Sequence, residues 1–280
     1  MADFLVADPS QYIIIQLQGH LREIVSFLNL SRHTGSNPLS LGKSKATMKL
    51  SRDVTQFLVR MFDNCIPPII RDSLWCMYIP IRLVRGNKWR VYTTFRDRIP
   101  FLTDSEYRDI YKEVQSVELN RETDTNSRCI EEIQKNITGN MILDAGCGRG
   151  YLSRLLAKNY AVTGIDIACA QSYTADTNPV LLNGSLESLP FPDKAFDTVV
   201  CAHTLEHVLN FERVVSELRR VTRHRLLIIV PIQRPYRYTF DLHVRFFPTI
   251  ESFQYAMRRG NDSECRNVGG DIFYKEDRID

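Results

Sequence analysis

Three glycines separated by single residues, Gly146, Gly148 and Gly150, directly follow a short apolar run at 141–145 that predicts a strand. Glycine has no Cβ, so a turn of this kind between a strand and a helix lets the backbone approach a bound ligand closely. The dinucleotide fingerprint needs its third glycine one residue later, where this chain has Tyr151. The spacing therefore disfavours a nicotinamide cofactor.

Asp166 stands twenty residues after Gly146, directly behind a second apolar run at 161–165. A carboxylate at the end of the second strand is well placed to accept both hydroxyl groups of an adenosine ribose. The first strand, the glycine turn and this acid together predict a site for an adenosine-containing cofactor.

Three histidines follow strands of the predicted sheet and are candidates for acid–base chemistry. His203 comes two residues after the predicted strand at 196–201, His207 lies one helical turn further on, and His243 lies in the segment 236–247. A hydroxyl acceptor needs a base and a neutral amine does not, and imidazole titrates near neutral pH. We take His203 and His243 as the candidate catalytic residues, and His207 as a packing or hydrogen-bonding residue of the turn.

The segment from His203 to His207 also matches the His-x-x-Glu-His pattern of the inverted zinc proteases. The match falls in a strand-to-helix turn inside the cofactor-binding frame, and the sequence shows no convincing third ligand downstream. We therefore expect no metal site and no peptidase activity.

The C-terminal half alternates short apolar runs with helical patterns, which is typical of a parallel sheet with crossover helices. A hairpin after Gly269-Gly270, pairing 271–275 with 265–268, is expected at one edge of the sheet, with 271–275 as the edge strand. The other expected strands are 141–145, 161–165, 180–182, 196–201 and 226–230, and the clearest helices are 151–158 and 211–221.

The N-terminal half carries mainly helical patterns. Thr125 or Asn126 can cap a helix through Ile137. We expect a helical, basic N-terminal region at 1–120 that caps the substrate site, and a cofactor-binding domain at 121–280. The expected elements of the first region are helices at 11–30, 54–62 and 104–119, a loop at 33–45 and a strand at 89–95.

Five short motifs occur in order between residue 141 and about residue 230: Asp144-Ala145-Gly146-Cys147-Gly148-Arg149-Gly150, Gly164-Ile165-Asp166, Gly184-Ser185-Leu186-Glu187-Ser188-Leu189-Pro190-Phe191, Phe196-Asp197 and Leu205-Glu206-His207-Val208. With them the chain resembles the class I S-adenosylmethionine (SAM) dependent methyltransferases of the broad type-11 group. The resemblance implies an α/β fold with a Rossmann-like methyltransferase sheet, mostly parallel with an antiparallel edge hairpin.

The resemblance also implies roles for individual residues in binding SAM and its product S-adenosylhomocysteine. Asp144 and the three glycines would hold the methionine end, and Asp166 the ribose. Ser185 and Leu186 would contact the adenine. The family usually has an acid where Ser185 stands. Cys201 also belongs to the expected cofactor site. The family has Pro-Gly where this chain has Arg223-His224, a departure expected to alter only a surface turn.

Composition places the chain among globular proteins, with 280 residues, 44% hydrophobic and 25% charged. It has no run of about 18 apolar residues, and the N-terminus carries Asp3 and Asp8 where an export signal would be basic. Seven cysteines without a Cys-x-x-Cys pair suggest reduced thiols. We therefore expect a cytoplasmic protein.

The basic residues concentrate towards the N-terminus: residues 1–120 hold 16 Lys and Arg against 12 Asp and Glu. Such a region could meet phosphates, anionic lipid headgroups or nucleic acid, or could be an ordinary solvated face. Together with Arg234, Arg237, Tyr236 and Tyr238 it favours a small acceptor, an oxygen of an anionic or phosphate-linked metabolite or a saccharide. RNA methylation and a non-catalytic SAM-binding or membrane-associated protein are the alternatives, and the oligomeric state is open.

Overall fold

The computed structural model describes residues 67–115, 123–169, 178–238, 240–258 and 263–278. The chain divides into two compact units, Met1–Thr93 and Thr94–Asp280, which are described separately. The expected helices at 11–30 and 54–62 and the loop at 33–45 lie outside the described residues. The division into regions at 1–120 and 121–280 stays a prediction.

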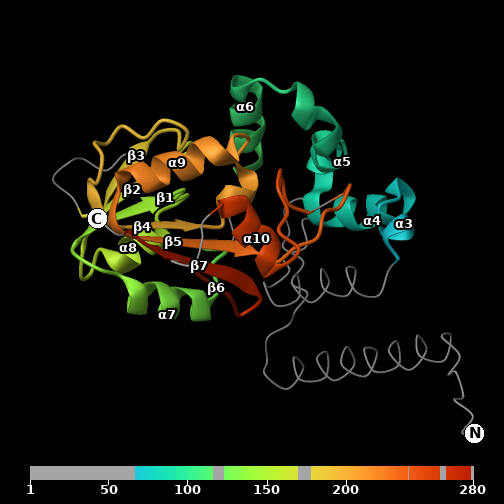
Figure 1. The fold of residues 1–280 in the computed structure, drawn as a ribbon. Helices are drawn as coiled ribbons and strands as arrows, with labels where there is room; N and C mark the ends of the chain where they lie inside the picture. The colour runs from blue at the N-terminus through green and yellow to red at the C-terminus, as the bar shows by residue number, and fades with distance from the viewer. Residues whose placement is uncertain (1–66, 116–122, 170–177, 239, 259–262, 279–280) are drawn as a thin grey trace, which may run out of the picture. The chain divides into compact units, whose positions relative to one another are not determined.

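The second unit contains a seven-stranded sheet in the order β3-β2-β1-β4-β5-β7-β6 (Figure 1). The first five strands are parallel, β7 pairs antiparallel with β5, and β6 pairs antiparallel with β7. This confirms the α/β fold class and its antiparallel hairpin. The strands are β1 (Met141–Ala145), β2 (Ala161–Asp166), β3 (Val180–Asn183), β4 (Phe196–Ala202), β5 (Thr222–Pro231), β6 (Ser263–Val268) and β7 (Asp271–Asp277).

One detail of the hairpin is wrong in the sequence-based prediction, which put 271–275 at the sheet edge. β7 lies between β5 and β6, so β6 is the edge strand. The burial pattern gives the reason: Ile272, Phe273 and Tyr274 of β7 are fully buried, whereas Glu264 and Asn267 of β6 are exposed and only Val268 is buried. An apolar strand gains more from an interior position, where both of its faces are covered.

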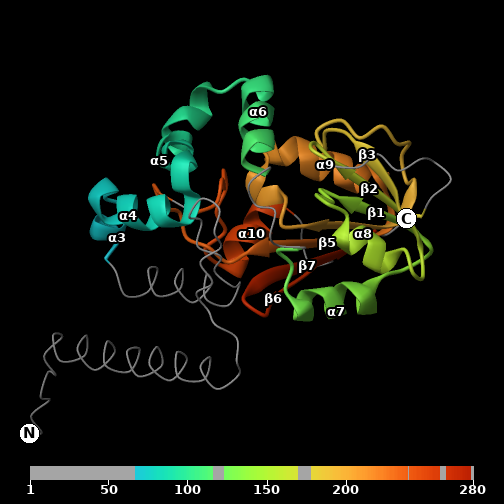
Figure 2. The same ribbon diagram turned by 180° about the vertical axis from the view of Figure 1, so that it is seen from behind.

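Helices cover both faces of the sheet (Figures 1 and 2). On one face, α7 (Ser127–Asn136) and α8 (Tyr151–Leu156) contribute Ile133 and Leu152 to one buried apolar cluster. On the other, α9 (Phe211–Val221) and α10 (Ile250–Met257) contribute Leu218 and Phe253 to a second cluster. Strands covered on both faces explain the continuous apolar run in β5.

Most expected helices of this unit are confirmed. α9 has the predicted bounds, α8 ends at Leu156 instead of residue 158, and Asn126 caps α7 by accepting a hydrogen bond from the Cys129 N–H at 2.9 Å. α10 was not predicted, although Thr249 and Ser252 form a capping box at its start. α6 (Asp104–Gln115) confirms the described part of the helix expected at 104–119, and the 3₁₀ turn η2 (Ile99–Phe101) precedes it.

The strand expected at 89–95 is wrong, because these residues form the helix α5 (Trp89–Arg98). Tyr92 and Phe95, three residues apart, are buried, while Arg90 and Asp97 are exposed. This helical period outweighs the strand preference of threonine and aromatic residues.

The described part of the first unit is helical, as expected. It comprises α3 (Pro68–Arg71), α4 (Leu74–Arg85), the 3₁₀ turn η1 (Gly86–Lys88) and the start of α5. Among the described residues no helix has the length and apolar character needed to cross a membrane.

Candidate functional site

The residues predicted to bind a cofactor lie where parallel strands end. The glycine turn follows β1, Asp166 ends β2, and Ser185 and Leu186 follow β3. Parallel pairing brings these ends to one edge, since Ala145 pairs with Ile165 and Asp166 with Asn183. Cys201 is the second-to-last residue of β4 and fully buried. Ligands of open α/β sheets bind at this carboxyl edge.

The glycine turn depends on left-handed backbone at all three glycines, with φ of 81° at Gly146, 52° at Gly148 and 73° at Gly150. A Cβ on Gly146 would lie 2.1 Å from the Thr204 Oγ1 atom, so the turn packs against the segment that follows β4. A Cβ on Gly148 would meet nothing within 4 Å, which leaves open space beside the turn. The turn therefore offers backbone to a ligand on that side.

Asp166 is buried and holds the glycine turn in place. Its Oδ2 atom accepts the Gly148 N–H at 2.9 Å, and its Oδ1 atom accepts the Ala168 N–H at 2.9 Å. Burial raises the pKa of this carboxyl, and the two backbone donors oppose that rise. Each carboxylate oxygen has a second acceptor position, so Asp166 can also accept ribose hydroxyls.

Asp144, at the end of β1, is also buried. Its Oδ2 atom accepts the Ser153 hydroxyl at 2.5 Å and thereby joins β1 to α8. Burial raises the pKa of Asp144 to about 6, against the effect of this hydrogen bond, and the nearby Asp166 charge adds to the rise. A cationic group bound at this edge would stabilise the ionised form of both acids.

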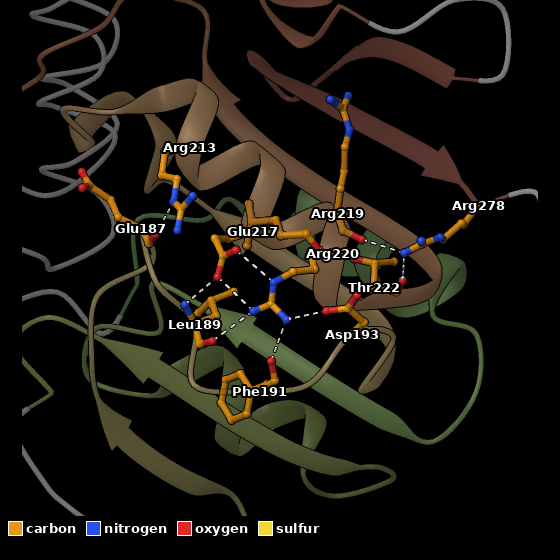
Figure 3. A network of polar contacts seen from close by, with 11 residues as sticks. Glu187, Leu189, Phe191, Asp193, Arg213, Glu217, Arg219, Arg220, Thr222 and Arg278 are labelled. Carbon is orange, nitrogen blue, oxygen red and sulfur yellow. Dashed lines mark hydrogen bonds and ion pairs between the residues drawn. The ribbon is translucent and has the colours of Figure 1, made fainter.

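The loop after β3 is fixed to α9 by a network of polar contacts (Figure 3). Glu217 accepts the Leu189 N–H at 2.8 Å, and Arg220 donates to the carbonyls of Leu189 at 3.0 Å and Phe191 at 2.8 Å. Glu217 and Arg220 also form an ion pair at 2.9 Å. Leu186 is buried, and the Ser185 hydroxyl accepts the Glu187 N–H at 3.2 Å. The network holds the predicted adenine-contacting segment against the domain.

We predict that Arg220→Ala lowers the free energy of unfolding by about 1–2 kcal/mol, because charged donors to two carbonyls and to the carboxylates of Glu217 and Asp193 are lost at a partly exposed site. Urea unfolding measures this change. Arg213→Ala is the matched control on the same helix, because Arg213 donates to one carbonyl at an exposed position, that of Glu187. Its effect should stay within about 0.5 kcal/mol. Equal losses in the two variants would contradict the anchoring role.

The structure places His203 between two carboxylates. His203 adopts a left-handed φ of 50°, its Nδ1 atom lies 3.4 Å from Glu206 Oε1, and its Nε2 atom lies 3.3 Å from Asp271 Oδ2. Burial by itself lowers the pKa of His203, but Asp271 and Glu206 raise it to about 10. The two carboxylates therefore favour the charged form of the His203 imidazole.

His243 lies beside His207, with the two ring centroids 4.7 Å apart. Burial lowers the pKa of His243 to about 3, and the neighbouring His207 adds to the decrease, so His243 is neutral. The His243 Nδ1 atom lies 2.6 Å from Gln233 Oε1, and the His207 Nδ1 atom lies 3.1 Å from the Leu242 carbonyl oxygen. The pKa of His203 is therefore raised and that of His243 lowered, although both side chains are found at the carboxyl ends of the strands.

Two tyrosines of α6 also reach this turn. Tyr107 donates a hydrogen bond to the His207 carbonyl oxygen, and the Tyr111 ring meets the His207 ring edge-on at 5.5 Å. Sequence reasoning missed these tyrosines, and it also missed Asp271 and Gln233, since no short-range pattern links them to the histidines.

Comparison with known proteins agrees with this geometry. Residues 143–230 match the family model described as "Methyltransferase domain". The ubiquinone biosynthesis O-methyltransferase of Rickettsia akari is 33% identical over 102 residues, covering 33% of this chain and 40% of that protein. The phosphatidylethanolamine N-methyltransferase of Cereibacter sphaeroides is 38% identical over 97 residues, covering 31% and 48%. The chain spans about two fifths of the length of the curated relatives it matches.

Among solved structures, a SAM-dependent methyltransferase from Aquifex aeolicus is similar with a TM-score of 0.44 and 18% identity, covering 59% of this chain and 97% of that one. The strand order, the glycine turn and the family match together define a class I SAM-dependent methyltransferase domain. Within that class, the segment 143–230 is similar to the methyltransferase domains of the type-11 group.

Proposed function

We propose that this protein is an enzyme that transfers a methyl group from SAM to a small-molecule acceptor and releases S-adenosylhomocysteine. The observation that carries the proposal is the glycine turn at the carboxyl edge, with the left-handed backbone and open side described above, in a segment that matches the methyltransferase family. Several curated relatives are named as methyltransferases, which supports the same reaction.

The residues of this edge fit SAM. The glycine turn and Asp144 would hold the methionine end, Asp166 the ribose hydroxyls, and Ser185 and Leu186 the adenine, beside the buried Cys201. Ser185 stands where the family usually has an acid, so recognition of the adenine would fall mainly to the backbone around Leu186. The bound cofactor supplies a methyl carbon on a positively charged sulfur.

The reaction is an in-line displacement in which an acceptor lone pair forms a bond to the methyl carbon while the carbon–sulfur bond breaks. Holding the acceptor close and in line supplies much of the rate, with effective concentrations of up to about 10⁵–10⁸ M from positioning. His243 is the side chain we propose to act on the acceptor, because its neutral imidazole keeps a lone pair that can receive a hydroxyl proton, although its lowered pKa makes it a weak base. His203, whose two ring nitrogens face Glu206 and Asp271, would position these two carboxylates.

We infer that the acceptor atom is an oxygen of an anionic or phosphate-linked small molecule, including a saccharide. Support comes from the arginines in the connection after β5: Arg234 donates to the Tyr236 hydroxyl at 3.2 Å, and Arg237, whose side chain is 57% exposed, pairs with Asp97 at 3.4 Å. Two relatives are named as a ubiquinone biosynthesis O-methyltransferase and a malonyl-[acyl-carrier protein] O-methyltransferase, which supports an oxygen acceptor. We also propose a cytoplasmic location and a peripheral membrane contact through the basic excess of 1–120.

Binding of SAM measured by calorimetry on the full chain tests the proposal. Wild-type protein should bind SAM and S-adenosylhomocysteine and should not bind NADH. Asp166→Ala should weaken SAM binding by about 1.5–3 kcal/mol, the value for hydrogen bonds to a charged group. Asp109→Ala, which removes an exposed acid on α6, is the control and should bind as wild type does. Binding of NADH without SAM, or unchanged affinity in Asp166→Ala, would contradict the assignment.

A further inference from the structure

A second cluster of possible ligand atoms lies beside the glycine turn. Glu206 and His207 belong to the 3₁₀ turn η3 (Leu205–His207) that follows β4, and His243 comes from the connection after β5. One carboxylate oxygen and one ring nitrogen from each histidine all lie within 4.8 Å of one another. Thr204, which packs against Gly146, precedes this turn directly, so the cluster borders the predicted cofactor site.

Glu206 is the first observation that points to a bound cation. The residue is 1% exposed, and neither of its carboxylate oxygens accepts a hydrogen bond, although His203 Nδ1 lies at an ion-pair distance of 3.4 Å. Its main-chain oxygen accepts the N–H groups of Val244 and Arg245, which fixes η3 to the segment that carries His243. A buried carboxylate without hydrogen bonds is costly, and a metal ion would satisfy it.

The orientation of the two histidines is the second observation. The Leu242 carbonyl and the Gln233 Oε1 atom can only accept, so the facing Nδ1 atoms of His207 and His243 carry the hydrogen. In the neutral form of each ring, the Nε2 atom then keeps a free lone pair. Metal-binding histidines are typically held in this way, with one nitrogen donating to an outer oxygen and the other facing the metal.

We propose that Glu206, His207 and His243 bind one divalent transition-metal ion, such as Zn²⁺ or Mn²⁺. Two imidazoles and one carboxylate suit such ions, and three protein ligands leave coordination positions open for other oxygen atoms. His203 is outside the set, because carboxylates face both of its nitrogens at 3.3 and 3.4 Å. The third ligand could not be recognised in the sequence, since His243 comes from a different inter-strand connection.

A further role of the metal rests on the proposed methyl transfer. An acceptor oxygen bound at an open position would be held next to the cofactor edge, and its proton would be released more easily. In that case His243 is a metal ligand and the proton leaves to solvent. The metal site itself does not depend on the reaction.

The test measures metal binding by the full chain in the absence of SAM, after dialysis against a chelator. Mn²⁺ is followed by the electron paramagnetic resonance signal of the free ion, and Zn²⁺ by calorimetry. Both ions are used because cysteine thiolates prefer softer ions such as Zn²⁺. The seven cysteines should therefore not bind Mn²⁺. We expect one ion per chain. Glu206→Gln and His243→Gln should each weaken binding at least tenfold, with folding checked by circular dichroism.

His224→Gln is the matched control, because His224 is half-exposed near the start of β5, at the opposite end of this strand from the proposed metal site. It should bind both ions as wild type does. If a variant does not fold, Mn²⁺ added to the wild type should still broaden the ring NMR signals of His207 and His243 before that of His224. Equal affinity in the three variants, or absence of binding by wild-type protein that does bind SAM, would overturn the metal site and leave the proposed function intact.

Discussion

Gly146→Ala is expected to reduce SAM affinity at least tenfold and to lower the free energy of unfolding by about 2–4 kcal/mol. A left-handed backbone costs an alanine about 1–2 kcal/mol. The new Cβ would also lie 2.1 Å from Thr204 Oγ1, so either the glycine turn or the segment after β4 must move. This contact joins the glycine turn of the cofactor site to Thr204, which directly precedes the turn η3 with Glu206 and His207 on the proposed acceptor side.

Calorimetry with SAM and urea unfolding measure the two effects, and Gly139→Ala separates them. Gly139 has a φ of 76°, and a Cβ there would lie 2.2 Å from the Asp197 Cβ atom, so the strain is similar. However, Gly139 precedes β1 and therefore lies at the amino end of this strand, whereas the glycine turn follows its carboxyl end. Gly139→Ala should therefore lose stability but keep SAM affinity within about twofold. Similar loss of affinity in both variants would show that the effect comes from general destabilisation.

The sheet and the cofactor edge could be predicted from the sequence because their signals are local. Each strand core is an apolar run, and the glycines and Asp166 stand within a few residues of a strand end. β5 shows the limit of this reasoning: it starts four residues before the predicted 226, at Thr222. Its polar beginning is stabilised by distant partners, since Arg223 pairs with Asp197 at 2.7 Å and Arg225 with Asp277 at 2.5 Å.

The acceptor side could not be predicted, because its contacts join segments far apart in the chain. The environment of His203 depends on Asp271 of β7, and the tautomer of His243 depends on Gln233. A pattern read along one segment carries no information on such pairs. The same reasoning explains the missed third member of the cluster: the His-x-x-Glu-His pattern contains Glu206 and His207, and only the fold brings the third side chain to them.

His243→Ala is expected to lower turnover at least tenfold while leaving SAM affinity within about twofold, once an acceptor is known. The side chain is buried beside His207, and it belongs to the connection after β5, a different segment from the glycine turn and Asp166. Loss of kcat without loss of donor binding is the pattern of an interaction with the acceptor or the transition state. The His224→Ala variant, which is changed near the start of β5, should have the same turnover rate as the wild type.

The two possible actions of His243 give different results in the same assay. If the neutral imidazole receives the acceptor proton directly, treatment of wild-type enzyme with a chelator leaves turnover unchanged, and only the variant is slow. If His243 binds a metal through its Nε2 atom, the chelator reduces the wild-type rate to that of the variant, and Mn²⁺ or Zn²⁺ restores the wild type alone. Turnover of His243→Ala equal to that of wild type would exclude both actions and move the acceptor away from this edge of the sheet.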